Sequence, residues 1–113
     1  MRELIRAGAD IGAADIDGNT VLICAAMEGQ EGCLRELIGA GADVGAANND
    51  GTTALMAAAK EGHEGCLREL IGAVADVGVT AVDAEGRTAV WWAKNQGHEK
   101  CVGMLEEAAS SIQ

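Results

Sequence analysis

The apolar positions of this chain form a pattern that occurs three times. In the first complete copy, four apolar residues recur at the spacing of one helix face: Cys33, Leu34, Leu37 and Ile38. They predict a helix over about residues 31–40, and a more continuous apolar run predicts another over residues 21–28. The pattern restarts 33 residues after Gly18, at Gly51, and 35 residues further on, at Gly86. Repetition at this period predicts stacked helix–turn–helix units.

Polar residues predict where these helices begin and end. Thr20 precedes the first helix, and its hydroxyl can accept a hydrogen bond from the first turn. Asp17 and Gly18 supply turn chemistry, because Asp bonds the backbone and Gly adopts positive φ. Gly41 is expected to adopt the left-handed conformation after the second helix. On the solvated side, two ion pairs at i, i+4 are predicted: Glu31 with Arg35, and Glu64 with Arg68.

The copies divide the chain into units of a single domain, residues 1–113: a partial repeat 1–14, then repeats 15–47, 48–80 and 81–113. Because the first unit begins inside a helix, upstream sequence or a neighbouring subunit is expected to cover its apolar end: Leu4, Ile5 and Leu22. In the last unit, Lys94 and Glu106 replace apolar residues, which predicts that no repeat follows. The loop over residues 74–84 is expected to be the least regular, since it carries the two-residue insertion and Val74 replaces a glycine.

Composition narrows the possible partners. The chain has no Phe, Tyr or Pro, so its core must consist mainly of small aliphatic residues, which suits closely packed helices. It carries 18 acidic and 8 basic side chains, a net charge of −10 that repels nucleic acid and attracts a basic protein surface. No run approaches the roughly 18 apolar residues of a spanning helix, so no membrane insertion is expected.

The cysteines predict a location. Three of them recur at one position of the copies: Cys33, Cys66 and Cys101. Stacked helices lie about 8–10 Å apart, beyond the roughly 7 Å between Cα atoms that a disulfide spans. Small buried free thiols are therefore expected, with Cys24 the most accessible. Such thiols are typical of a reducing compartment, which predicts an intracellular protein, first of the cytoplasm, with an organelle or the nucleus left open.

The stretches DIDGNTVLICAAMEGQ…GADVGA and NNDGTTALMAAAKEGH…VADVGV resemble ankyrin repeats over nearly the whole chain. Two family positions differ in every copy: Val21, Ala54 and Ala89 replace proline, and Ile23, Met56 and Trp91 replace histidine. The resemblance implies a mainly α ankyrin-repeat solenoid, with helix–turn–helix units and projecting β-hairpin-like turns. It also implies a protein–protein interaction module without enzymatic activity.

The residues that could carry catalysis or bind a metal do not cluster. The sequence has single histidines in separate repeats, His63 and His98, whereas a metal site needs three or four converging ligands. No phosphate loop, nucleophile elbow or paired-carboxylate motif occurs. We therefore expect no metal, no cofactor and no enzymatic activity.

Trp91 and Trp92, the only aromatic residues, have two interpretations. Either they pack the last repeat interface, or they form part of a cage for methylated lysine, as in some ankyrin arrays. Neighbouring helix positions diverge by about 100°, which favours packing.

In an ankyrin-like stack, the turn tips and the outer sides of the first helices line one concave surface. The corresponding residues form the candidate binding surface: Ile16, Asp17, Asn19, Met27, Glu28, Asn49, Asp50, Thr52, Lys60, Glu61, Ala84, Glu85, Arg87, Trp92, Asn95 and Gln96. Acids at the tips predict a partner protein with a basic patch, and Met27 or Trp92 could anchor it. The alternative is a structural subunit, or a fragment of an ankyrin array, held in a larger multiprotein assembly.

Overall fold

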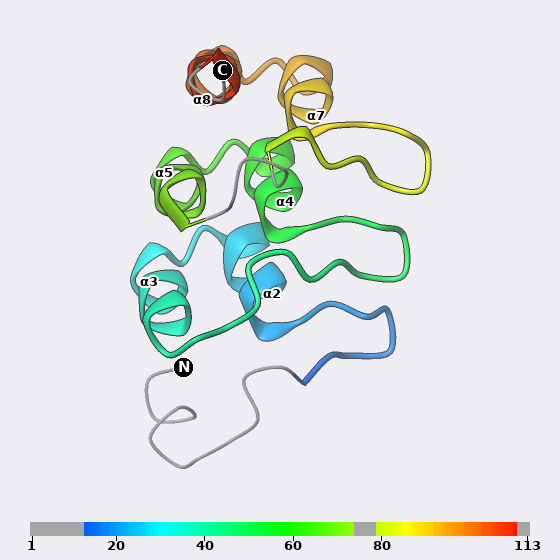
Figure 1. The fold of residues 1–113 in the computed structure, drawn as a ribbon, viewed down its shortest axis with the longest axis vertical. Coiled ribbons are helices and arrows are strands. Elements are labelled where there is room, and N and C mark those ends of the chain that lie inside the picture. Colours follow the sequence, from blue (N-terminus) through cyan, green and yellow to red (C-terminus); the bar gives the residue numbers. More distant parts are fainter. Residues whose placement is uncertain (1–12, 74–78, 111–113) are drawn as a thin grey trace.

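The computed structural model describes residues 13–73 and 79–110 of the chain. Over these residues the helices follow one another in three pairs: α2 (Val21–Glu28) with α3 (Glu31–Gly39), α4 (Ala54–Glu61) with α5 (Glu64–Ala73), and α7 (Ala89–Asn95) with α8 (Glu99–Ser110). Figure 1 shows α2, α4 and α7, the inner helices, stacked in one column, and α3, α5 and α8, the outer helices, in a second. The turns between pairs project to one side as fingers. The predicted mainly α solenoid is confirmed.

Each inner helix begins at a threonine, as the sequence predicts. The hydroxyls of these threonines accept hydrogen bonds from the backbone N–H three residues on, at 3.1–3.3 Å: Thr20, Thr53 and Thr88. α2 and α4 end at Gly29 and Gly62, whose left-handed backbone lets the chain turn into the outer helix. Gly41 has a φ of +95°, which confirms the left-handed conformation expected after α3.

The core lies between the two columns and consists of small and aliphatic side chains. Its largest fully buried members include Leu22, Ile23, Leu34, Leu37, Leu55, Met56, Leu67, Leu70 and Leu105. In α4 every residue from Ala54 to Ala59 is buried, because this helix lies between α2 and α7. Alanines on its surface leave room for both neighbours, so a core without Phe or Tyr still packs closely.

Each finger is held by an acid or amide side chain that accepts hydrogen bonds from the turn backbone, and in the first finger this residue is not the one that the sequence predicted. Asp15, not Asp17, accepts bonds from the backbone N–H groups of Asp17 and Asn19, both at 2.9 Å. The equivalent residues of the next fingers, Asn48 and Asp83, make the same pair of bonds two and four residues on. The turn therefore depends on the residue three positions before the glycine, and Asp17 leaves its carboxylate at the tip.

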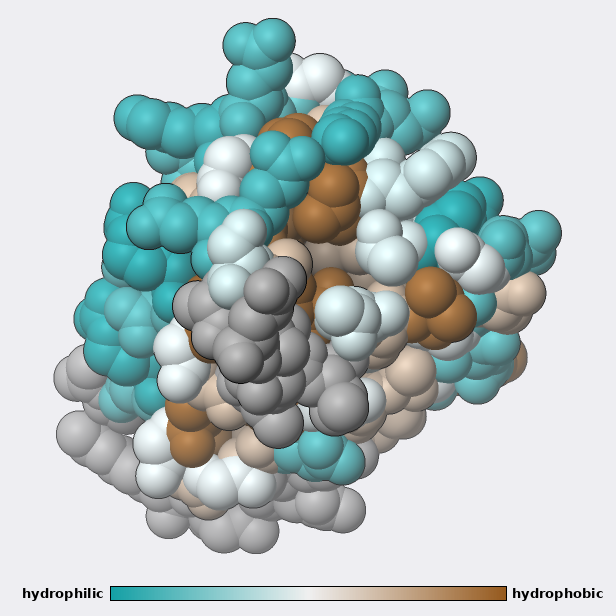
Figure 2. Space-filling model, turned by 45° about the horizontal axis from the view of Figure 1, so that its top comes forward, coloured by the Kyte–Doolittle hydropathy of each residue, from teal (hydrophilic) through white to brown (hydrophobic). Residues whose placement is uncertain are grey.

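The C-terminal end of the stack is polar, as predicted. Lys94 stands where the earlier repeats bury an alanine, and Glu106 stands where they have a half-buried isoleucine. The charged groups of Lys94 and Glu106 lie 3.5 Å apart in solvent. Figure 2 looks obliquely onto this end and shows mainly hydrophilic residues, with separate apolar patches between them. Toward the other end, Leu22 is 1% exposed, while Leu4 and Ile5 lie outside the described residues, as does Val74 of the loop expected to be irregular.

The predicted burial of the three repeated cysteines is only partly right. Cys66 and Cys101 are buried, but Cys33 is half-buried, as is Cys24, and all four cysteines are free thiols. Cys66 lies near Glu31 of α3, and Cys101 near Glu64 of α5, so this position faces the preceding outer helix. Among the described residues no outer helix precedes α3, which accounts for the partial exposure of Cys33.

Candidate functional site

The candidate surface combines the finger tips with the ends of the inner helices. None of its sixteen residues is buried. Eleven are exposed: Ile16, Asp17, Glu28, Asn49, Asp50, Lys60, Glu61, Ala84, Glu85, Asn95 and Gln96. Five are half-buried: Asn19, Met27, Thr52, Arg87 and Trp92. The fold therefore leaves every one of these side chains accessible.

The finger tips are bonded to one another through the backbone. The N–H of Asn49 donates to the carbonyl of Asp17 at 3.0 Å, and the N–H of Ala84 donates to the carbonyl of Asp50 at 2.9 Å. This contact requires glycine at Gly51, since a Cβ there would lie 2.7 Å from the backbone nitrogen of Ala84. The three tips thus form one continuous strip.

Two asparagines of the candidate surface make side-chain hydrogen bonds to neighbouring fingers within this strip. Asn48 Nδ2 donates to Asn19 Oδ1 at 2.8 Å, and Asn49 Nδ2 donates to the carbonyl of Ile16 at 3.2 Å. Asn19 and Asn49 therefore also hold the fingers in register. By contrast, the side chain of Ile16 extends into solvent and is 94% exposed, more than any other large apolar residue described.

The third finger is tied to α7 through a buried carboxylate. The side chain of Asp83 is 0% exposed, and its Oδ2 accepts from Arg87 Nε at 2.9 Å and from Trp92 Nε1 at 3.1 Å. Burial alone would raise the pKa of Asp83, but bonds from Arg87, Glu85 and Trp92 outweigh it, and the pKa is lowered. Sequence reasoning missed this residue, although the acid or amide three positions before each glycine was a visible signal.

Cations cover the two tryptophans. Lys60 Nζ lies 4.8 Å from the ring centroid of Trp92, and the guanidinium carbon of Arg87 lies 4.5 Å from it. Arg87 also lies 5.3 Å from the ring of Trp91, and the two rings meet edge to face with centroids 5.0 Å apart. Contrary to the expected divergence, the rings converge, and the cation between them belongs to the chain itself.

The two tryptophans differ in burial. Trp92 packs against the core, but Trp91 is 42% exposed, so its predicted packing in an interface is wrong. Its counterparts Ile23 and Met56 are covered by the inner helix of the following repeat. No described helix follows α7 in that column, which leaves Trp91 in solvent.

The histidines connect neighbouring repeats. His63 Nε2 lies 3.0 Å from the carbonyl of Met27, and His98 Nε2 lies 3.0 Å from the carbonyl of Lys60. Since a carbonyl oxygen only accepts, Nε2 carries the proton. Each ring therefore satisfies a carbonyl near the end of the preceding inner helix and fixes the position of the candidate residue there.

The described residues hold no group of three His, Cys, Asp or Glu side chains placed to bind a metal ion. Burial raises the pKa of the Cys24, Cys66 and Cys101 thiols, and nearby carboxylates raise it further. These thiols are therefore protonated at neutral pH. Within the described residues no helix combines the length and apolar character needed to cross a bilayer.

Comparison with known families agrees with this geometry. The family model described as ankyrin repeats (3 copies) matches residues 1–81 and again residues 30–112, so the chain belongs to the ankyrin repeat family. No curated protein matches it. Ankyrin repeats are generally protein–protein interaction modules, and such domains are typically non-catalytic.

Proposed function

We propose that this chain is a non-enzymatic module that binds a partner protein on the concave face formed by its fingers and inner helices. The observation that carries the proposal is the strip of bonded finger tips. Its backbone groups are engaged with one another, while Ile16, Asp17, Asp50 and Glu85 are exposed at the tips. A surface ordered before binding loses little conformational entropy when a partner docks.

The charge of this face supports a partner with a basic patch. Each tip carries an acid at the same position, Asp17, Asp50 and Glu85, and the whole chain has a net charge of −10. Such a surface steers a cationic partner toward it. Ile16 supplies an apolar contact at the tip of the first described finger, and Met27 and Trp92 are half-buried candidates nearer the helices.

The test reverses the charge at the three tips, with Asp17→Lys, Asp50→Lys and Glu85→Lys in one variant. With a partner recovered by the wild-type chain from cell extract, we expect slower association and a weaker salt dependence, measured by surface plasmon resonance. The melting temperature should not change, because these side chains are exposed. A control with Glu36→Lys, Glu99→Lys and Glu106→Lys makes the same change of charge on the outer helices α3 and α8, away from the finger tips. If both variants bind like wild type, the tips do not contact the partner.

The exposure of Trp91 favours a second candidate function, that of a subunit held in a larger assembly. A tryptophan that is 42% exposed at the end of the stack is a suitable contact for another protein. Sedimentation of the isolated chain separates the two functions. A stable monomer supports the module, whereas self-association or obligate co-purification supports the subunit. In either case we propose an intracellular protein, which the four free cysteines support.

A further inference from the structure

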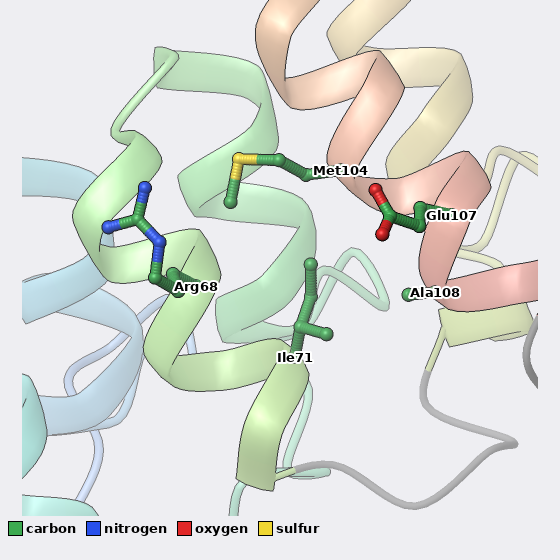
Figure 3. A pocket seen from close by; sticks show the side chains of 5 residues that line it. All are labelled: Arg68, Ile71, Met104, Glu107 and Ala108. Carbon is green, nitrogen blue, oxygen red and sulfur yellow. The ribbon is translucent and has the colours of Figure 1, made fainter.

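A groove lies between the outer helices α5 and α8, on the side of the molecule away from the fingers. It has a volume of about 410 Å³ and is lined by Arg68 and Ile71 of α5 and by Met104, Glu107 and Ala108 of α8. Figure 3 shows Met104 extending from α8 toward α5, between Arg68 and Glu107. The groove has an apolar floor with a cation on one side and an acid on the other.

The preceding interface of the same stack shows what this cationic position binds. Between α3 and α5, the counterpart of Arg68 is Arg35, whose Nε and Nη2 donate to Glu69 at 3.2 and 3.1 Å. Arg35 Nη2 also donates to Glu31 at 2.8 Å, which confirms the predicted pair within α3. The bond from Glu69, with its charge, is the main cause that raises the pKa of Arg35. Two carboxylates therefore satisfy this arginine.

Arg68 has lost both of these acids. The position of Glu69 is taken by Met104 in α8. Glu64, which the sequence predicted as the partner of Arg68, instead lies 3.9 Å from Lys100 Nζ of the next repeat. Among residues 13–73 and 79–110, Arg68 forms no ion pair, and that prediction is wrong. Its guanidinium is exposed at the edge of the groove.

We propose that this groove binds a segment of a partner polypeptide that carries a carboxylate next to an aliphatic side chain. The carboxylate bonds Arg68, as Glu69 bonds Arg35 one repeat earlier. The aliphatic side chain packs on Ile71 and Met104, and the flexible thioether of Met104 adapts to its shape. Glu107 favours a lysine or a free N–H on the other side of the segment. The site is independent of the finger tips, so either surface can be tested without the other.

The experiment follows the methyl signal of Met104 by NMR in the full chain labelled at its methionine methyl groups. The probe is a capped leucine–glutamate–leucine peptide, and the reference is the same peptide with glutamine in place of glutamate. We expect the Met104 signal to move with the glutamate peptide at millimolar concentrations, while Met27 and Met56 stay in place. The glutamine peptide should bind roughly tenfold more weakly, because it lacks the charge-assisted bond.

Three variants make the result decisive. Arg68→Gln should abolish the difference between the two peptides, whereas Arg35→Gln, on the preceding interface, should leave it unchanged. Met104→Glu recreates the carboxylate of Glu69, so it should remain folded by circular dichroism and lose the peptide. Because this variant lacks the Met104 methyl group, its binding is followed through the backbone amide signals of Arg68 and Ile71 in α5, which are recorded for the wild type as well. The proposal is overturned if the signals do not move, if both peptides bind equally, or if folded Met104→Glu still binds.

Discussion

The residue three positions before the turn glycine holds the finger in all three repeats, and in the third repeat, as Asp83, it also binds the side chains of Arg87 and Trp92. Asp15 and Asn48 accept the turn bonds of their fingers from positions that are exposed or half-buried. Asp83 makes the same two bonds, and its second oxygen also accepts from Arg87 and from Trp92. An amide suffices for the turn, but only a carboxylate can accept bonds through both of its oxygens.

We therefore expect Asp83→Asn to destabilise the protein although Asn48 is tolerated. The new amide nitrogen would face the N–H groups of Arg87 and Trp92, and leaving such donors without an acceptor costs about 1–3 kcal/mol. Urea unfolding measures the loss. Asp15→Asn is the matched control and should change little, because that carboxylate makes its bonds in solvent. Equal losses in the two variants would show that the second set of bonds does not matter.

The pH dependence of this difference provides a second check. The pKa of Asp83 lies below its ordinary value of 3.8 in the folded chain. Its ionised form therefore stabilises the fold fully above about pH 3.8, and this contribution is lost as the pH falls through the lower folded-state pKa. The stability gap between wild type and Asp83→Asn should accordingly narrow below that pH and remain constant between pH 5 and 7.

At the scale of the helices, the junction between inner and outer helix is defined by a glycine and by the histidine of the next repeat. Gly29 has a φ of +72°, and a Cβ there would lie 2.7 Å from His63 Nδ1. Gly97 has nearly the same backbone, with a φ of +77°, but a Cβ there would meet nothing within 4 Å. The two glycines therefore share the backbone requirement and differ in the contact.

This difference predicts unequal effects of alanine. Gly97→Ala should cost about 1 kcal/mol, the penalty of a left-handed residue with a Cβ. Gly29→Ala should cost about 1–3 kcal/mol more, since the ring of His63 must move and its bond to Met27 weakens. Thermal unfolding of both variants, with His63→Ala as a background, gives the comparison. If Gly29→Ala and Gly97→Ala lose the same stability, the ring of His63 moves aside without an energetic penalty.

The helices were the most predictable elements, because local chemistry determines them. Thr20, Thr53 and Thr88 begin the inner helices as expected, and the glycines after α2 and α4 end them. The sequence could not reveal which acids would meet which cations between repeats. Glu64 could pair with Arg68 of its own helix or with Lys100 of the next repeat, and in the folded stack it lies 3.9 Å from Lys100 Nζ. Because Glu64 pairs with Lys100, the guanidinium of Arg68 at the edge of the groove has no acidic partner among the described residues.

On the scale of the whole molecule, the main contacts between described helices join helices of one repeat or of adjacent repeats. α4 is the only inner helix described with an inner neighbour on each side. Its residues Ala54–Ala59 are buried, whereas α7 buries only Ala89 and Ala93. The stack was predictable from its period, but the exposure of Trp91 was not, because an apolar residue at an inner position normally indicates a covered one.

We expect amide hydrogen exchange to be slowest in α4. Opening α4 requires separation from both α2 and α7, so its amides should exchange only through global unfolding, while those of α7 exchange faster through local opening. Mass spectrometry or NMR under native conditions measures both rates. Equal protection of α4 and α7 would indicate that the described stack opens only as a whole.

The position of the tryptophans has a consequence for optical experiments. The chain contains no Tyr or Phe, and both tryptophans lie in α7, in contact with each other. Intrinsic fluorescence therefore reports on the last repeat alone, while far-ultraviolet circular dichroism reports on every helix. If the two signals follow different melting curves, the last repeat detaches before the others unfold. The native sequence thus carries its own site-specific fluorophore at one end of the stack, and no label is needed to observe that end separately.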